Sequence, residues 1–204
     1  MFEKLYNRAE ETGSDITMSA VTTFNDNNSN EFSQSNTYAN LDIFPKAFFE
    51  KDFTPEETID FLMDICVYPP GKIIRREFLL ENNIRFPENI NNYEDGVFFF
   101  NIWLNAKKIS LVKHFGYVYR MYSDTSTSYR NDFNKLQIFK AFKEKKRTLQ
   151  KYHVYKKIKD KFESCKKKGI LLWFGKIKDN RVKILYMLLM LDRKSTRLNS
   201  SHGY

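Results

Sequence analysis

The order of apolar and polar positions in the first forty residues predicts a helix, a strand and a loop. From residue 2 the apolar positions recur at helical spacing, and Gly13 is a residue type that often ends a helix. The segment 15–24 is rich in β-branched residues and predicts a strand. Residues 25–40 are dominated by Asn and Ser with few apolar anchors, so we expect a surface loop there.

Three further helical segments are predicted before residue 107. Thr54, Pro55 and Glu57 fit the N-cap, N1 and N3 positions of a capping box, and an apolar helical face follows them. A short helix is expected over residues 75–82. The run 95–106 is almost entirely apolar, and it predicts a helix that is buried on most of its sides.

The second half of the chain changes from strand-like to basic and helical. Residues 108–121 predict one or two strands, and lysine-rich helices are expected from Asp132 onward. Residues 1–133 contain 13 Lys and Arg against 20 Asp and Glu, a net charge of −7, whereas residues 134–190 contain 18 against 4, a net charge of +14. No apolar run approaches the ~20 residues that a transmembrane helix requires.

The basic segment 134–190 has three interpretations. The simplest is a solvated helical hairpin. The second is a cationic amphipathic surface that lies on an anionic membrane. The third is a nucleic-acid-binding segment, which we do not expect, because the front of the chain is acidic and no nucleic-acid-binding fold signature occurs.

Two adjacent carboxylates, Glu94 and Asp95, stand directly before the apolar helix. Asp is among the residues that cap helices, and the helix dipole stabilises negative charge at this end, so we expect a lowered pKa for Asp95. A carboxylate at the edge of a cleft could also act as a general base that accepts the proton of an acceptor hydroxyl. The two roles are compatible at one position.

Four short motifs occur in a fixed order between residues 72 and 120. They are a K-x-x-R-R-x-F-L segment, an I-x-F-P segment, a Glu-Asp pair before an apolar helix, and a Y-x-Y-R segment. The matching positions are Lys72, Arg75, Arg76, Phe78 and Leu79; Ile84, Phe86 and Pro87; Glu94 and Asp95; and Tyr117, Tyr119 and Arg120. Over roughly residues 1–130, this ordered set resembles the family 2 glycosyltransferases.

The resemblance implies an α/β fold: part of a Rossmann-like, GT-A type glycosyltransferase domain with a parallel sheet, followed by a helical, Lys-rich C-terminal extension. It implies an inverting sugar transfer with Asp95 as the general base and Glu94 beside it. It also implies that substrate is contacted by Lys72, Arg76, Tyr119 and Arg120. Tyr122 and Asp124 depart from the family pattern. Two roles therefore stay open for Arg120: it binds the donor diphosphate, or it pairs with an acidic neighbour such as Glu94.

The partners implied by the resemblance are a nucleotide sugar and a glycan or lipid-linked acceptor, in bacterial surface-polysaccharide synthesis. The expected location is the cytoplasm, peripheral at the inner face of the cell membrane. The family uses an Asp-x-Asp motif to hold a divalent metal, Mg²⁺ or Mn²⁺, against the donor diphosphate. No two aspartates in this chain have that spacing, so we expect the metal ligands and the nucleotide-sugar half to precede Met1. Cys66 and Cys165 lack metal-ligand spacing and are expected to be reduced, structural thiols.

The chain therefore divides into an acceptor-side part, residues 1–131, a basic helical extension, residues 132–191, and a tail, residues 192–204. Residues 192–202 resemble the translation of a sequencing adapter rather than a protein segment. On this division the fragment by itself is expected to lack transferase activity. The alternative function is a non-catalytic module that binds a membrane surface or a partner, in which Glu94 and Asp95 only cap a helix.

Overall fold

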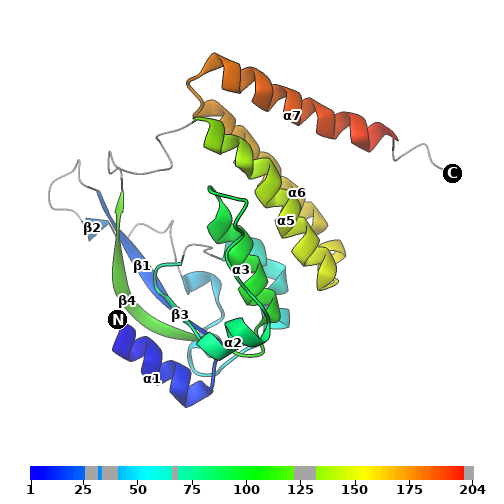
Figure 1. Ribbon diagram of the computed structural model, residues 1–204. Coiled ribbons are helices and arrows are strands. Elements are labelled where there is room, and N and C mark those ends of the chain that lie inside the picture. Colours follow the sequence, from blue (N-terminus) through cyan, green and yellow to red (C-terminus); the bar gives the residue numbers. More distant parts are fainter. Residues whose placement is uncertain (26–31, 34–40, 66–68, 122–131, 200–204) are drawn as a thin grey trace.

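In the computed structural model, the described residues are 1–25, 32–33, 41–65, 69–121 and 132–199. A small sheet lies beside helix α3, and three long helices complete the chain (Figure 1). The strands are β1 (Ile16–Asn25), β2 (Phe32–Ser33), β3 (Lys72–Ile74) and β4 (Ile109–Met121). The α-helices are α1 (Phe2–Thr12), α2 (Arg76–Glu81), α3 (Glu94–Asn105), α5 (Gln137–Lys151), α6 (Tyr155–Gly175) and α7 (Asn180–Asn199). The 3-10 helices are η1 (Leu41–Ile43), η2 (Lys46–Phe49), η3 (Pro55–Asp64) and η4 (Asp132–Leu136).

The sheet is built around β1. On one side β4 runs parallel to β1 over its whole length, from the pair Ile16 and Ile109 to the pair Asn25 and Met121. On the other side β2 and β3 pair with β1 in the antiparallel sense. The prediction of a parallel sheet was therefore wrong for this part of the chain: the sheet is mixed. The parallel β1–β4 pair needs a crossover connection, whereas β3, which follows β2 and η1–η3 in the chain, pairs antiparallel with the beginning of β1.

Several elements predicted from the sequence are confirmed. Helix α1 ends at Gly13, which has the left-handed conformation (φ 63°), and segment 15–24 forms β1. Residues 109–121 form one strand rather than two. Of the predicted surface loop, residues 26–31 and 34–40 lie outside the described residues, and Phe32–Ser33 form β2.

The capping box at Thr54 is present, but it opens a 3-10 helix rather than an α-helix. The Thr54 amide donates to Glu57 Oε2 at 2.8 Å, and the reciprocal bond from the Glu57 amide to the Thr54 side chain is also present. The backbone at Phe61 (φ −124°, ψ 15°) interrupts the helix near its end. Capping residues define where a helix begins; they do not decide its hydrogen-bond period.

Two glycines with positive φ offer a matched test of the sheet geometry. Gly71 (φ 77°) precedes β3, and a Cβ atom there would lie 2.7 Å from Val21 Cγ2 and 3.0 Å from the Ser19 carbonyl oxygen. Gly13 (φ 63°) has no atom within 4 Å of the same position. We expect Gly71→Ala to lower the free energy of unfolding by ~2–5 kcal/mol, since backbone strain and overpacking combine. Gly13→Ala should lower it by only ~1–2 kcal/mol, from backbone strain alone. Urea denaturation of both variants measures the difference, and equal effects would show that β1 does not approach Gly71 so closely.

Helix α3 lies between the sheet and the hairpin formed by α5 and α6 (Figure 1). Eight of its twelve residues are buried, as the apolar run predicted. Helix α3 runs alongside α5: the Asn91 amide donates to Gln137 Oε1 at 2.6 Å near one end, and Thr148 Oγ1 donates to Asn101 Oδ1 at 3.2 Å further along. These contacts place the first turn of α3 beside the first half of α5.

The basic extension shares its hydrophobic core with the front of the chain. Phe142 and Phe162, whose rings are 5.9 Å apart, belong to the same buried cluster as Ile16 of β1 and Trp103 of α3. The α5–α6 hairpin is thus packed on one face rather than solvated all round. The division of the chain at residues 131 and 132 stays a prediction.

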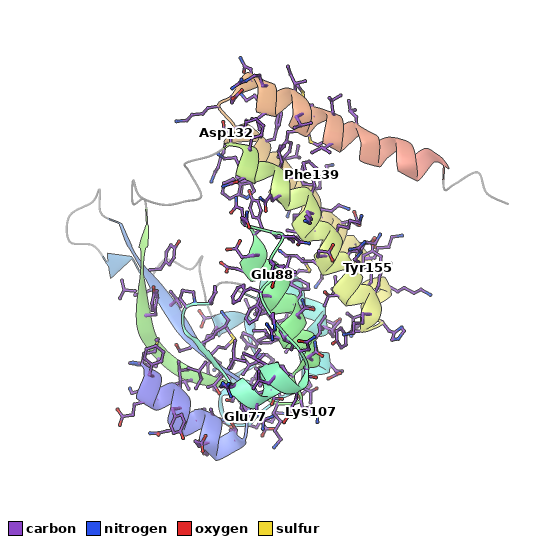
Figure 2. All side chains as sticks on the ribbon, viewed as in Figure 1. Glu77, Glu88, Lys107, Asp132, Phe139 and Tyr155 are labelled. Atoms are coloured by element: carbon purple, nitrogen blue, oxygen red, sulfur yellow. The ribbon has the colours of Figure 1, made fainter. Side chains whose placement is uncertain are left out.

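Helix α7 is attached to the beginning of the hairpin by polar and aromatic contacts. Asp132 Oδ2 accepts hydrogen bonds of 2.7 Å from the amides of Lys178 and Asp179, and the ring of Tyr186 lies 4.7 Å from that of Phe139. Figure 2 shows Asp132 at this end of the hairpin and Tyr155 at the opposite end. Among the helices that the structure describes, none is both long enough and apolar enough to cross a membrane.

Candidate functional site

Glu94 and Asp95 form the first turn of α3. The N-cap of the helix is Tyr93, which adopts a left-handed conformation (φ 71°), and Asp95 is the second helical residue. Within the described part of the chain, neither carboxylate accepts a hydrogen bond or forms an ion pair. The alternative role in which Asp95 caps the helix is therefore not seen, since the N-cap is Tyr93. The Asp95 carboxylate is left available for another group.

The environment of Asp95 raises its pKa above the ordinary value of 3.8. Burial is the largest cause, and the negative charge of Glu94 adds to it; the positive charges of Lys72 and Lys145 act in the opposite direction. We had expected a lowered pKa from the helix dipole. That expectation was wrong, because the half-buried carboxylate lies against the apolar body of α3 and lacks hydrogen-bond donors.

Lys72 is one of the predicted substrate-contacting residues that the structure brings to Asp95. It begins β3, opposite Met18 of β1, and its ammonium lies 5.9 Å from the centroid of the Phe99 ring on α3. Its charge stabilises the ionised form of Asp95. Lys72 and the Glu94–Asp95 pair therefore share one side of α3.

Arg76 is not brought to Asp95. It begins α2, and together with Arg75 it lines a pocket of about 640 Å³ against α1. Next to it, Arg75 forms a 2.6 Å ion pair with Asp15, a buried carboxylate that also accepts a 2.8 Å hydrogen bond from the Lys107 amide. Asp15 precedes β1 and Lys107 precedes β4, so Arg76 lies near the amino ends of these strands.

Tyr119 and Arg120 lie near the carboxyl end of β4, opposite Thr23 and Phe24 of β1. Three residues, 106–108, join α3 to β4, so β4 runs back alongside α3 toward the end at which α3 begins (Figure 1). Ligands of sheets with parallel strands bind beyond the carboxyl ends of the strands. Tyr119 is half-buried there; the side chain of Arg120, with Tyr122 and Asp124, lies outside the described residues.

Lys145 of α5 is a member of this site that the sequence reasoning missed. Lys145 as a whole is half-buried; its ammonium lies 5.7 Å from the Phe100 ring centroid and 5.1 Å from that of Phe142, and its charge acts on Asp95. Burial lowers the pKa of Lys145 to about 8, although Cys165 and Asp95 oppose the change. A signal was present: Lys145 follows Ile138, Ala141 and Phe142 at helical spacing, on the apolar stripe of α5.

The described residues do not provide the expected metal site. Among them, no three His, Cys, Asp or Glu side chains come together in a group that could hold an ion. Cys165 has a free thiol whose pKa is raised by burial. Cys66 lies outside the described residues.

The chain is similar to two kinds of poly(ribitol-phosphate) glycosyltransferase. It is 29% identical over 119 residues to a poly(ribitol-phosphate) beta-glucosyltransferase of Bacillus spizizenii, which covers 58% of this chain and 16% of that protein. It is 36% identical over 75 residues to the poly(ribitol-phosphate) beta-N-acetylglucosaminyltransferase TarS of Staphylococcus aureus, which covers 37% of this chain and 13% of that protein. The chain thus spans less than a fifth of the length of these curated relatives.

The solved structures with some similarity include S. aureus TarS. Residues 1–349 of TarS in complex with UDP match with a TM-score of 0.44 and 18% identity, over 72% of this chain and 36% of that one. A longer TarS structure matches with a TM-score of 0.38 and 19% identity. The match covers 89% of this chain and 32% of that one. No protein-family model matches the sequence. The curated relatives are glycosyltransferases, and their weak homology supports assigning this chain to a glycosyltransferase-like family.

Proposed function

We propose that the chain is part of a glycosyltransferase that moves a sugar from a nucleotide-sugar donor to an acceptor hydroxyl, with Asp95 as the general base. The observation that carries this proposal is the Asp95 carboxylate itself. It stands on the first turn of a buried helix, has no hydrogen-bond or ion-pair partner among the described residues, and has a raised pKa. Similarity to known glycosyltransferases supports the same reaction class.

In the proposed reaction, Asp95 accepts the proton of the acceptor hydroxyl as its oxygen attacks the anomeric carbon. The new carbon–oxygen bond forms on the face opposite the bond to the diphosphate, which breaks and leaves with its electron pair. A single displacement of this kind inverts the configuration and needs no covalent intermediate. A raised pKa makes Asp95 a stronger base than an ordinary aspartate, while the charges of Lys72 and Lys145 favour its ionised form.

The donor site is proposed to lie in a segment of the whole transferase outside this chain. The chain spans only 16% and 13% of the matched relatives, and its described residues hold no cluster for Mg²⁺ or Mn²⁺. The chain alone is therefore expected to be inactive. Substrate roles for Tyr119 and Arg120 remain part of the proposal, because both positions lie at the carboxyl end of β4.

The names of the relatives indicate an acceptor class. Both act on poly(ribitol phosphate), so an anionic polyol-phosphate chain is the acceptor we propose, in place of an unspecified glycan. The net charge of +14 over residues 134–190 suits such a polyanion. The same charge would also favour a peripheral position at an anionic membrane, where a lipid-linked acceptor is held.

The pH dependence of transfer tests the assignment of the base. As the pH falls through the raised pKa of Asp95, kcat/KM is expected to fall, with its midpoint above 3.8. Glu94→Gln removes the neighbouring negative charge, so it should lower the pKa of Asp95 and move this midpoint to lower pH. The measurement is a kcat/KM profile of the whole transferase and of its Glu94→Gln variant. A midpoint that does not move would show that another group titrates.

A further inference from the structure

A groove of about 920 Å³ runs along the α5–α6 hairpin. Its walls come from η3, α5 and α6, and Tyr93 closes it at the first turn of α3. The same groove is reached by Lys145, whose charge acts on Asp95. Asp95 does not line the groove, but the charge of Lys145 links the groove to the proposed catalytic base.

The ammonium of Lys145 lacks the partner that a buried charge normally has. It lies over the rings of Phe100 and Phe142, and the described residues supply no hydrogen-bond acceptor for it. Aromatic faces offset part of the desolvation of an ammonium group, but they do not replace a charged acceptor. An anionic group in the groove would satisfy this ammonium, and a second one, Lys168, is exposed on the groove wall.

The remaining walls suit a polyhydroxylated chain. The Trp173 ring lines the groove edge to face against Tyr93, with centroids 5.4 Å apart, and the Lys176 ammonium lies 4.8 Å from its centroid. The rest of the ring surface can pack against C–H groups. The carboxylates of Asp64 and Asp160 line the same groove and are exposed acceptors for hydroxyl groups. Because these carboxylates can accept hydrogen bonds from hydroxyl groups while Lys145 and Lys168 attract phosphates, the groove suits a chain in which hydroxyl and phosphate groups alternate.

We propose that this groove binds the acceptor chain as a phosphodiester-linked polyol, with Lys145 and Lys168 binding phosphate oxygens and Trp173 packing on the carbon chain. This inference rests on the proposed function and extends it, since it places the acceptor on the basic helices rather than on the sheet. A phosphate held by Lys145 leaves a neighbouring hydroxyl of the same polymer close to Asp95. The α5–α6 hairpin thus supplies part of the substrate site.

Binding can be measured on the chain without any sugar transfer. The probe is a short, soluble glycerol-phosphate oligomer, and the readout is tryptophan fluorescence. Trp103 is fully buried, so Trp173 should give the change, and Trp173→Phe should abolish it. Saturable binding by the wild type is expected. Lys145→Met keeps the side-chain length but removes the charge, and should raise Kd at least ~tenfold, the loss expected for one charge-assisted hydrogen bond.

The matched control is Lys143→Met, an exposed lysine on the same helix that does not line the groove. Its Kd should stay within about twofold of the wild type.

An unchanged Kd in Lys145→Met would overturn the proposal. So would binding to phosphatidylglycerol vesicles without binding to the oligomer, or equal Kd values for the oligomer and inorganic phosphate. If Lys145→Met does not fold, Lys168→Met takes its place: a raised Kd supports the groove, and an unchanged one overturns it. Because no transfer is assayed, these results are independent of the role of Asp95.

Discussion

Replacing Asp95 by Asn is expected to lower kcat/KM for sugar transfer by ~10²–10⁴-fold, the range that a positioned general base contributes. Asn has nearly the same shape but cannot accept the proton of the acceptor hydroxyl. The substitution belongs in the whole transferase, assayed for release of the nucleoside diphosphate. Glu81→Gln is a matched control, because Glu81 is an exposed carboxylate on α2, and it should transfer sugar at the wild-type rate.

The fold of the Asp95→Asn variant should be at least as stable as the wild type at neutral pH. The folded state raises the pKa of Asp95, so it binds the proton more tightly than the unfolded chain does. Stability from this group is then present at low pH and is lost as the pH rises through the interval between the two pKa values. A neutral side chain at position 95 avoids that loss. If the variant transfers sugar normally, Asp95 is not the base and the non-catalytic module becomes the better interpretation.

The largest effect on stability is expected from Trp103→Ala. Trp103 is fully buried on α3, and its ring lies 5.1 Å from Phe99 and 6.3 Å from both Phe44 and Phe53. Removing so large a buried ring should lower the free energy of unfolding by ~3–5 kcal/mol. Urea denaturation followed by circular dichroism gives the value; a loss below ~1 kcal/mol would contradict the described packing.

Trp103 is held in the core by a hydrogen bond as well as by packing. Trp103 Nε1 donates to Thr58 Oγ1 at 2.9 Å, and Thr58 Oγ1 donates to the Pro55 carbonyl at 2.7 Å. Thr58→Val should therefore lower the free energy of unfolding by ~1–3 kcal/mol, since the indole N–H is left unsatisfied in the core. Comparing Thr58→Val with Trp103→Ala separates the contribution of this hydrogen bond to stability from that of the packed ring.

The candidate site shows where sequence reasoning was sufficient and where it was not. The Glu94–Asp95 pair could be located because two carboxylates before an apolar run are recognisable from their order alone. Their electrostatics could not be predicted, because the pKa of Asp95 depends on burial and on Lys72 and Lys145, which are distant in sequence. Arg76 shows that nearness in sequence does not imply a shared site. It lies four residues after Lys72 in the same motif, yet it lines the pocket beside α1.

Local sequence patterns by themselves determined the elements and their ends: the apolar period of α3, the strand of β-branched residues, Gly13 after α1 and the capping box at Thr54. These features depend on neighbours within one turn or one strand, so the order of residues contains them. Only the tertiary structure decided that the sheet is mixed, that the basic hairpin shares the core, and that the charge of Lys145 acts on Asp95. Strand direction, burial and charge interactions depend on residues that are far apart along the chain, and only packing brings those residues together.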